Sequence, residues 1–146
     1  MIYWFCGQPA SGKTTLAKAL IEKLQTKHVH IDGDNLREIL QNFDYTREGR
    51  EKNIQSVLDI ARFMDAAGYD VVISVVAPYN EHRRALKASN QMVEVYVHTS
   101  EIRGREKFFV AEFEVPTENY IDIDTTNESV ENCIIKILNN KSNGLG

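Results

Sequence analysis

The chain has 146 residues and a formal net charge of -4, with 17 lysines and arginines against 21 aspartates and glutamates. This length fits one domain with a buried core, and the mixed charge argues against a broad nucleic-acid-binding surface. No membrane segment or signal peptide is predicted, because the apolar runs are short and the first opens a strand at residue 2. Both cysteines lie in apolar patterns typical of core positions, which favours a cytoplasmic protein without disulfides.

The first motif follows the apolar run 2–6, which predicts a buried strand. Residues 7–14 read Gly-Gln-Pro-Ala-Ser-Gly-Lys-Thr and fit the phosphate-binding P-loop pattern. Apolar residues at helical spacing predict a helix over 12–25, so the glycines fall on a strand-to-helix turn. Backbone N–H groups of such a turn bind phosphates, the lysine adds positive charge, and the threonine hydroxyl ligates Mg²⁺. A glycine-rich turn with a chance lysine is the alternative. The predicted contacts to ATP are Gly7, Ala10, Ser11, Gly12, Lys13, Thr14 and Thr15.

A second polar group follows a predicted strand over 28–31. Asp32 and Asp34 lie at its carboxyl end, at the same sheet edge as the P-loop, and Arg37 lies one helical turn beyond Asp34, in a predicted helix over 35–41. One carboxylate can hold Mg²⁺ or its waters while the other accepts the proton of an attacking hydroxyl. The arginine can bind an anionic group of the acceptor. The alternative is that one of the aspartates only caps the helix.

The rest of the chain alternates between helix and strand. The expected order is a polar loop around 44–49, an amphipathic helix over 54–64, a strand over 71–76, a helix over 81–89, a strand over 93–97, an irregular stretch over 100–118, a strand over 120–123, a helix from 130 and a flexible tail over 139–146. This order predicts a single α/β domain over residues 1–146 with a five-stranded parallel sheet. The fold class is a nucleoside-kinase-like P-loop NTPase, a three-layer α/β/α sandwich.

Motifs along nearly the whole chain resemble those of the adenylylsulfate kinases, which phosphorylate the ribose 3′-hydroxyl of adenosine 5′-phosphosulfate. Besides the P-loop, the matching segments are Ile-Asp-Gly-Asp-Asn-Leu-Arg at 31–37, Phe43, Arg50, Lys-Asn-Ile at 52–54, Ala-Gly at 67–68, Ala-Pro-Tyr at 77–79, Arg83, Val-Tyr-Val-His-Thr at 95–99, Phe-Glu-Val-Pro at 113–116 and Asp-Thr at 124–125. Asp-Gly-Asp alone also occurs in related small-molecule kinases such as gluconate kinases.

The resemblance implies roles for the matching residues. Lys13, Asp32 and Asp34 would be catalytic, with Asp34 at the acceptor hydroxyl and Asp32, together with Thr14, at the metal. Phe43 would stack on the base of the acceptor, although a core position under the loop is the alternative. The implied acceptor-binding residues are Asp34, Arg37, Phe43, Arg50, Asn53, Pro78 and Tyr79.

The departures from the family lie in the acceptor half. Ala77 stands where the family usually has a serine, so no covalent step can run through that position. The lid is shortened to about residues 100–112 and lacks the family's Lys-Gly-Leu-Tyr and Phe-Thr-Gly motifs. Arg103, Arg105 and Lys107 could still reach the transferred phosphoryl group, and Phe108 or its neighbour Phe109 could supply a second stacking face. A solvated charged loop with one buried aromatic is the alternative.

The sequence therefore predicts a kinase that uses ATP and Mg²⁺ to phosphorylate a hydroxyl of a small anionic acceptor. Adenylylsulfate or a related nucleotide is the leading acceptor, which would place the protein in sulfate assimilation. The alternatives are a kinase of a cytidine diphosphate derivative or of a gluconate-like sugar acid, and a non-catalytic nucleotide-binding protein. Members of the family commonly form dimers, so the resemblance also implies a homodimer.

Overall fold

The protein folds around a five-stranded parallel sheet with the strand order β2-β3-β1-β4-β5. The computed structural model describes residues 1–144, with side chains up to residue 140. The strands are β1 (Ile2–Cys6), β2 (His28–Asp32), β3 (Asp70–Ser74), β4 (Met92–His98) and β5 (Tyr120–Asp124). The helices are α1 (Lys13–Lys23), α2 (Gly33–Leu40), α3 (Arg47–Ala66), α4 (Asn80–Ser89) and α5 (Val130–Gly144), with a 3-10 turn η1 (Glu106–Phe108). The predicted α/β fold with a parallel five-stranded sheet is thus confirmed.

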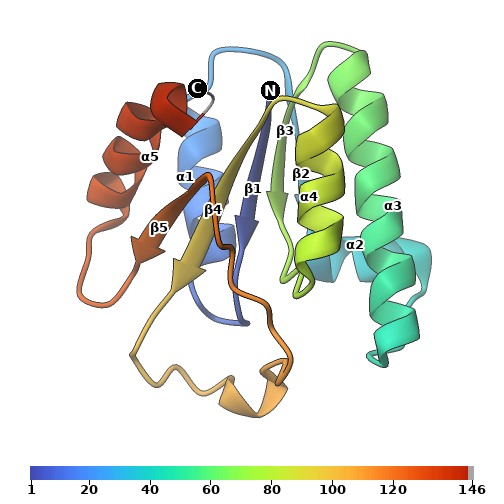
Figure 1. Ribbon diagram of the computed structural model, residues 1–146. Coiled ribbons are helices and arrows are strands. Elements are labelled where there is room, and N and C mark those ends of the chain that lie inside the picture. The colour runs from blue at the N-terminus through green and yellow to red at the C-terminus, as the bar shows by residue number, and fades with distance from the viewer. Residues whose placement is uncertain (145–146) are drawn as a thin grey trace.

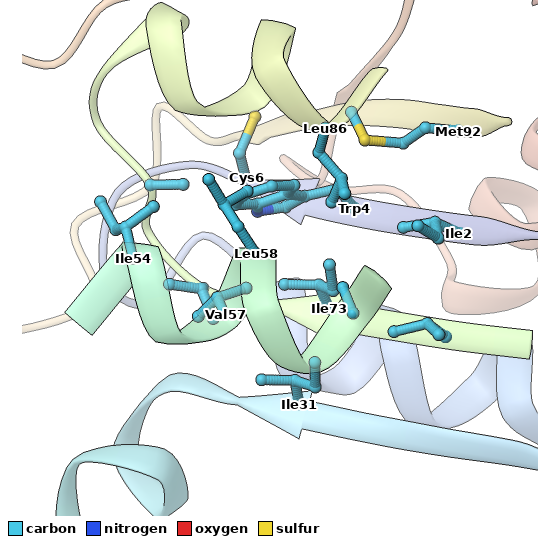
Figure 2. Packing of buried hydrophobic residues seen from close by; sticks show 14 of the residues in the cluster. Ile2, Trp4, Cys6, Ile31, Ile54, Val57, Leu58, Ile73, Leu86 and Met92 are labelled. Carbon is cyan, nitrogen blue, oxygen red and sulfur yellow. The ribbon is translucent and has the colours of Figure 1, made fainter. Parts of the chain in front are cut away.

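Helices cover both faces of the sheet, as Figure 1 shows. All five residues of β1 are buried, because successive side chains of this central strand point to opposite faces. Trp4 and its same-face neighbours pack against α3 and α4 (Figure 2). Tyr3 and Phe5 pack on the other face in a cluster that includes residues of α1 and α5. The continuous apolar run at 2–6 is therefore the central strand of a three-layer sandwich.

All five strands point their carboxyl ends toward one edge of the sheet, at the bottom of Figure 1. The P-loop follows β1, the Asp-Gly-Asp segment follows β2, and the lid segment, residues 100–112, follows β4. Open α/β sheets bind ligands outside this edge. The topology thus brings segments that are distant in sequence to one place.

The largest differences from the predicted boundaries lie at the start of α3 and at the end of α5. The prediction of a loop up to residue 49 was wrong from residue 47 on, because Thr46 caps α3 by accepting a hydrogen bond from the N–H of Gly49 at 3.3 Å. A Cβ on Gly49 would lie 2.2 Å from the carbonyl oxygen of Asp44, so glycine lets the preceding loop fold back on the helix. At the other end α5 extends to Gly144, past the point where we expected a flexible tail, and residues 145–146 lie outside the described residues. Among the described helices, none is long and apolar enough to cross a membrane.

Candidate active site

A cavity of about 910 Å³ lies at the carboxyl edge of the sheet. The P-loop, the start of α2, the first half of α3, the segment after β3 and the lid segment all contribute to its lining. Ligand pockets usually measure about 300–1,000 Å³. This cavity is near the upper end of that range, which suits a site that must hold a phosphoryl donor and an acceptor together.

Two P-loop glycines adopt backbone conformations that a side chain would oppose. Gly7 has a φ of 151°, and a Cβ there would lie 2.1 Å from the carbonyl oxygen of Val97 in β4. Gly12 has a φ of 109° at the N-cap of α1. Thr125 holds the loop from outside by donating a hydrogen bond from its hydroxyl to the carbonyl oxygen of Ser11 at 2.7 Å. The loop is therefore fixed on one side by its close approach to the backbone of β4, and on the other side by Thr125, in the connection between β5 and α5.

Lys13 is held inside the P-loop. Its ammonium Nζ donates a hydrogen bond to the carbonyl oxygen of Gln8 at 2.8 Å. Burial lowers the pKa of Lys13 to about 8, while the carboxylates of Asp32 and Asp34 act in the opposite direction. An anionic phosphate in the loop would restore the usual preference for the charged form. A bound triphosphate would therefore raise the pKa of Lys13 and keep its ammonium group charged.

Asp32 is the centre of a hydrogen-bond chain that crosses the sheet edge. Its Oδ1 accepts hydrogen bonds from the hydroxyls of Thr14 and Ser74, both at 2.9 Å. His30 Nε2 lies 2.7 Å from Ser74 Oγ, and it must be the donor because the Ser74 proton goes to Asp32. Asp32 occupies the N-cap position of α2 but makes no capping hydrogen bond with its side chain. The structure therefore places this carboxylate at the P-loop instead of at the helix end.

The atoms around Asp32 suit a hard cation. A threonine hydroxyl and a carboxylate are oxygen ligands of the kind that Mg²⁺ prefers, with water and substrate phosphates completing its shell. Among the described residues there is no group of three or more His, Cys, Asp or Glu side chains that could enclose a metal ion. The site thus fits a metal that arrives with a nucleotide, and Thr14 and Asp32 are the residues that would hold it.

The opposite wall of the cavity carries charges suited to an acceptor. Asp34, in the first turn of α2, lines the cavity together with Arg37, Arg50, Asn53 and Pro78. Asn53 is 3% exposed, and its Oδ1 has no hydrogen-bond partner among the described residues. A buried amide oxygen without a partner is costly, so the site would gain from a ligand that donates to it.

The aromatic side chain at this wall comes from Tyr45 and not from Phe43. Arg37 donates hydrogen bonds to the carbonyl oxygens of Asn42 and Asp44, at 2.9 and 3.3 Å, and its guanidinium lies 4.1 Å from the ring centre of Tyr45. Phe43, between these two carbonyls, is 57% exposed and lies outside the cavity lining. The base-stacking role predicted for Phe43 therefore passes to Tyr45 as a proposal. The sequence analysis predicted no role for Tyr45, because this residue lies in an irregular loop.

Tyr79 also differs from its predicted place. Its side chain is fully buried under the cavity wall, while neighbouring Pro78 lines the cavity. The Tyr79 hydroxyl donates a hydrogen bond to Glu112 Oε1 at 3.1 Å, and Arg50 donates to the same oxygen at 3.0 Å. Tyr79 thus supports the site from behind through Glu112, a residue that motif comparison did not single out.

The lid segment is attached to the P-loop at both of its ends. Near the start, Arg103 donates hydrogen bonds to the carbonyl oxygens of Ala10 and Thr125, at 2.9 and 3.3 Å. Near the end, the Gln8 side chain makes two hydrogen bonds of 2.9 Å with the backbone N–H and C=O of Val110. Gln8 fills a variable position of the P-loop pattern, so the motif alone gave it no role.

Between these attachments the lid presents cations and aromatic rings to the cavity. Arg105, Lys107, Phe108 and Phe109 all line it. The two phenylalanines are 53% and 42% exposed, so neither is the buried aromatic of a solvated loop. Arg105 has no ion-pair partner among the described residues, and its guanidinium lies 5.1 Å from the ring centre of Phe108. The segment therefore faces the cavity with unpaired positive charge.

Comparison with known proteins identifies the family. The family model for adenylylsulphate kinase matches residues 1–107. The chain belongs to this family. The match includes the P-loop and the Asp-Gly-Asp segment and ends inside the lid segment. The predicted family is thus confirmed, and with it the class of enzyme: an ATP-using phosphotransferase with an alcohol group as acceptor.

The relatives of this chain include kinases that are named for different acceptors. An adenylyl-sulfate kinase of Oceanobacillus iheyensis is 32% identical over 162 residues, covering 94% of this chain and 81% of that protein. A cytidine diphosphoramidate kinase of Campylobacter jejuni is 30% identical over 131 residues, covering 84% of this chain and 77% of that protein. The structure of the Mycobacterium tuberculosis APS kinase in complex with AMPPNP and APS shares the fold, with a TM-score of 0.80, 19% identity, and 94% of this chain and 95% of that chain covered.

Proposed function

We propose that this kinase transfers the γ-phosphoryl group of ATP to a ribose hydroxyl of a small anionic nucleotide, with adenylylsulfate as the leading acceptor. The observation that carries the proposal is that one cavity joins Lys13 and Thr14 of the P-loop to Asp34 and the cation Arg50. A phosphoryl donor on one side and a hydroxyl on the other would then meet in line. The 32% identity to the Oceanobacillus iheyensis adenylyl-sulfate kinase supports the acceptor.

The residues of the cavity divide the work of the transfer. Lys13 and the lid cations Arg105 and Lys107 stabilise the negative charge that spreads over the transferred group. Asp34 orients the acceptor hydroxyl and accepts its proton. Arg50 binds the anionic end of the acceptor. Because Ala77 carries only a methyl group where the family has a serine, the transfer is direct, with no phosphorylated enzyme at that position.

Mg²⁺ is the metal that we propose for this reaction. When bound, it would neutralise part of the charge on the phosphates of ATP. Thr14 and Asp32 would hold it, and Ser74 with His30 would orient Asp32 through the chain of hydrogen bonds. Turnover should therefore stop in excess chelator and return on addition of Mg²⁺.

A cytidine diphosphate derivative is the second candidate acceptor. The 30% identity to the Campylobacter jejuni cytidine diphosphoramidate kinase favours it. The end of the family match at residue 107 also favours it, because residues 108–112 complete the lid over the acceptor half. A lid of different sequence would cover a different base.

The test is ADP release from ATP with a panel of acceptors: adenylylsulfate, cytidine diphosphoramidate, gluconate and none. We expect turnover on a nucleotide, and a loss of about a hundredfold or more in Asp34→Asn, since general-base catalysis contributes about 10²–10⁴-fold. Thr126→Ala, outside the cavity lining, is the control. Turnover on gluconate alone, or equal turnover in Asp34→Asn, would overturn the proposal.

We also propose a cytoplasmic location and a homodimer. The buried free thiols of Cys6 and Cys133 fit a reducing compartment. Dimers are common in the family. Light scattering coupled to size-exclusion chromatography would measure the assembly, and a monomer at all concentrations would contradict the second point.

A further inference from the structure

Glu112, at the end of the lid segment, lies beside the residue expected to bind the anionic end of the acceptor. Its Oε1 accepts the two hydrogen bonds from Arg50 and Tyr79, at 3.0 and 3.1 Å. Its side chain is 49% exposed, and that of Arg50 is 22% exposed. Glu112 itself lies outside the cavity lining, but Arg50 lines the cavity, so a ligand that reaches Arg50 comes close to the exposed carboxylate of Glu112.

Glu112 is ionised in this setting. Hydrogen bonds from its own backbone N–H and from Tyr79, with the nearby charge of Arg50, lower its pKa. The Tyr79 hydroxyl is in turn fixed, because the Tyr79 ring is fully buried and the Arg47 guanidinium stacks on it at 4.0 Å from the ring centre. A carboxylate held in this way cannot easily turn away from Arg50.

The two arginines at the acceptor end are both engaged by other groups, although Arg105 and Lys107 of the lid have no ion-pair partner among the described residues. Arg50 forms an ion pair with Glu112. Arg37 donates two hydrogen bonds to loop carbonyl oxygens and stacks on the ring of Tyr45. A terminal sulfate has only hydrogen-bond acceptors, so its oxygens would meet the Glu112 carboxylate with repulsion. A terminal phosphoryl group that carries an NH₂ or OH can accept from Arg50 and donate to Glu112 at the same time.

We propose that Glu112 determines acceptor specificity, and that it selects nucleotides whose terminal phosphoryl group carries a hydrogen-bond donor over nucleotides that end in sulfate. This inference rests on the proposed nucleotide kinase activity, and it departs from that proposal at one point: it ranks acceptors with such a terminal group above adenylylsulfate, which the family match alone favours. It separates the acceptor into two parts. The lid and Tyr45 would contact the base, and Arg50 with Glu112 would contact the terminal group. The phosphoramidate named for the Campylobacter jejuni relative has a terminal group of the selected kind.

The experiment compares four acceptors that combine two bases with two terminal groups. They are adenosine and cytidine, each as the 5′-phosphosulfate and as the 5′-diphosphoramidate, assayed for kcat/KM with saturating Mg-ATP. On either base, the wild type should prefer the phosphoramidate. In Glu112→Gln the ratio of phosphoramidate to sulfate should fall by about tenfold or more, the size expected for one charge-assisted hydrogen bond, while the KM for ATP stays unchanged.

Two further variants keep the outcome clear. Glu118→Gln removes a charge from the same stretch of chain, where the side chain is exposed, and should leave the ratio unchanged. Glu112→Asp keeps the charge but shortens the side chain, and should lower the ratio by less than Glu112→Gln does; it serves as the test if the glutamine variant does not fold. An unchanged ratio in the Glu112 variants overturns this inference and leaves the kinase activity standing. Absence of turnover on all four nucleotides by the wild type overturns both.

Discussion

The two halves of the cavity are built in different ways. In the ATP half, the P-loop is held through its own backbone: Lys13, Arg103 and Thr125 donate to the carbonyl oxygens of Gln8, Ala10 and Ser11. In the acceptor half, side chains hold other side chains, as in the contacts of Glu112 with Arg50 and Tyr79. The phosphate-binding loop itself is a short local pattern, although Arg103 and Thr125, which hold it, lie far along the chain. The Arg50–Glu112 contact has no such local pattern and needs two residues far apart in sequence to agree.

This difference bears on the family match, which covers the P-loop and much of the acceptor half and ends inside the lid segment. Every nucleotide triphosphate presents the same phosphates, so the loop that binds them can keep one design. The acceptor varies among the relatives, from adenylylsulfate to cytidine diphosphoramidate by their names. A site built from side chains can change its acceptor through single substitutions. The family match ends inside the lid, which is consistent with such change in the acceptor half.

The largest effect is expected in the ATP half. Lys13→Ala should lower kcat/KM for ATP by about 10²–10³-fold, because it removes a buried positive charge aimed at the transferred group. Steady-state kinetics with varied ATP would measure it. Lys18→Ala, on the exposed side of the same helix, is the matched control. Comparable losses in the two variants would remove the special role of Lys13.

A smaller and selective effect is expected in the acceptor half. Arg50→Ala should lower kcat/KM for the acceptor by about ten- to a hundredfold, the size of one or two hydrogen bonds to a charged group, with little change in the KM for ATP. Kinetics with each substrate varied in turn would separate the two. Arg62→Ala, farther along α3 and outside the cavity lining, should affect neither. A loss of ATP binding in Arg50→Ala would break the division of the cavity into two halves.

The lowered pKa of Lys13 predicts a pH effect on ATP binding. In the free protein Lys13 loses its proton near pH 8, whereas bound phosphates require the charged form. The titration of Lys13 should therefore leave the affinity for ATP unchanged below pH 8. Above pH 8 it should lower that affinity by up to about tenfold per pH unit. Calorimetry in buffers of different ionisation enthalpy should detect proton uptake above pH 8. The uptake should be absent in Lys13→Ala.

The smallest effect concerns the contact that joins the two halves. Gln8→Leu removes both hydrogen bonds to Val110, each worth about 0.5–1.5 kcal/mol. We expect faster amide exchange in residues 100–112 and a rise of a few-fold in KM for the acceptor. Hydrogen exchange with mass spectrometry would measure the first. Gln55→Leu, whose exposed side chain bonds only Asp59 within α3 among the described residues, is the control.

Much of this protein follows from its sequence alone. The apolar run before the P-loop and the alternation of strands and helices predicted the parallel sheet, and they did so because periodicity and strand ends are local properties. The positions of Asp32 and Asp34 followed too, since carboxyl ends of parallel strands share one edge. A pattern confined to neighbouring residues can express all of this.

The tertiary structure decided which side chains line the acceptor half of the cavity and which lie behind it. Tyr45 lines the cavity in place of Phe43, Tyr79 is buried, and Glu112 meets Arg50 across 62 positions of the chain. Likewise Gln8 and Val110 lie 102 positions apart. These contacts depend on how loops pack against helices and on the direction of each side chain, and no local spacing encodes them. The sequence thus determined the fold, the phosphate site and part of the acceptor half, whereas the positions of Tyr45, Tyr79 and Glu112 were determined only by the packing of distant segments.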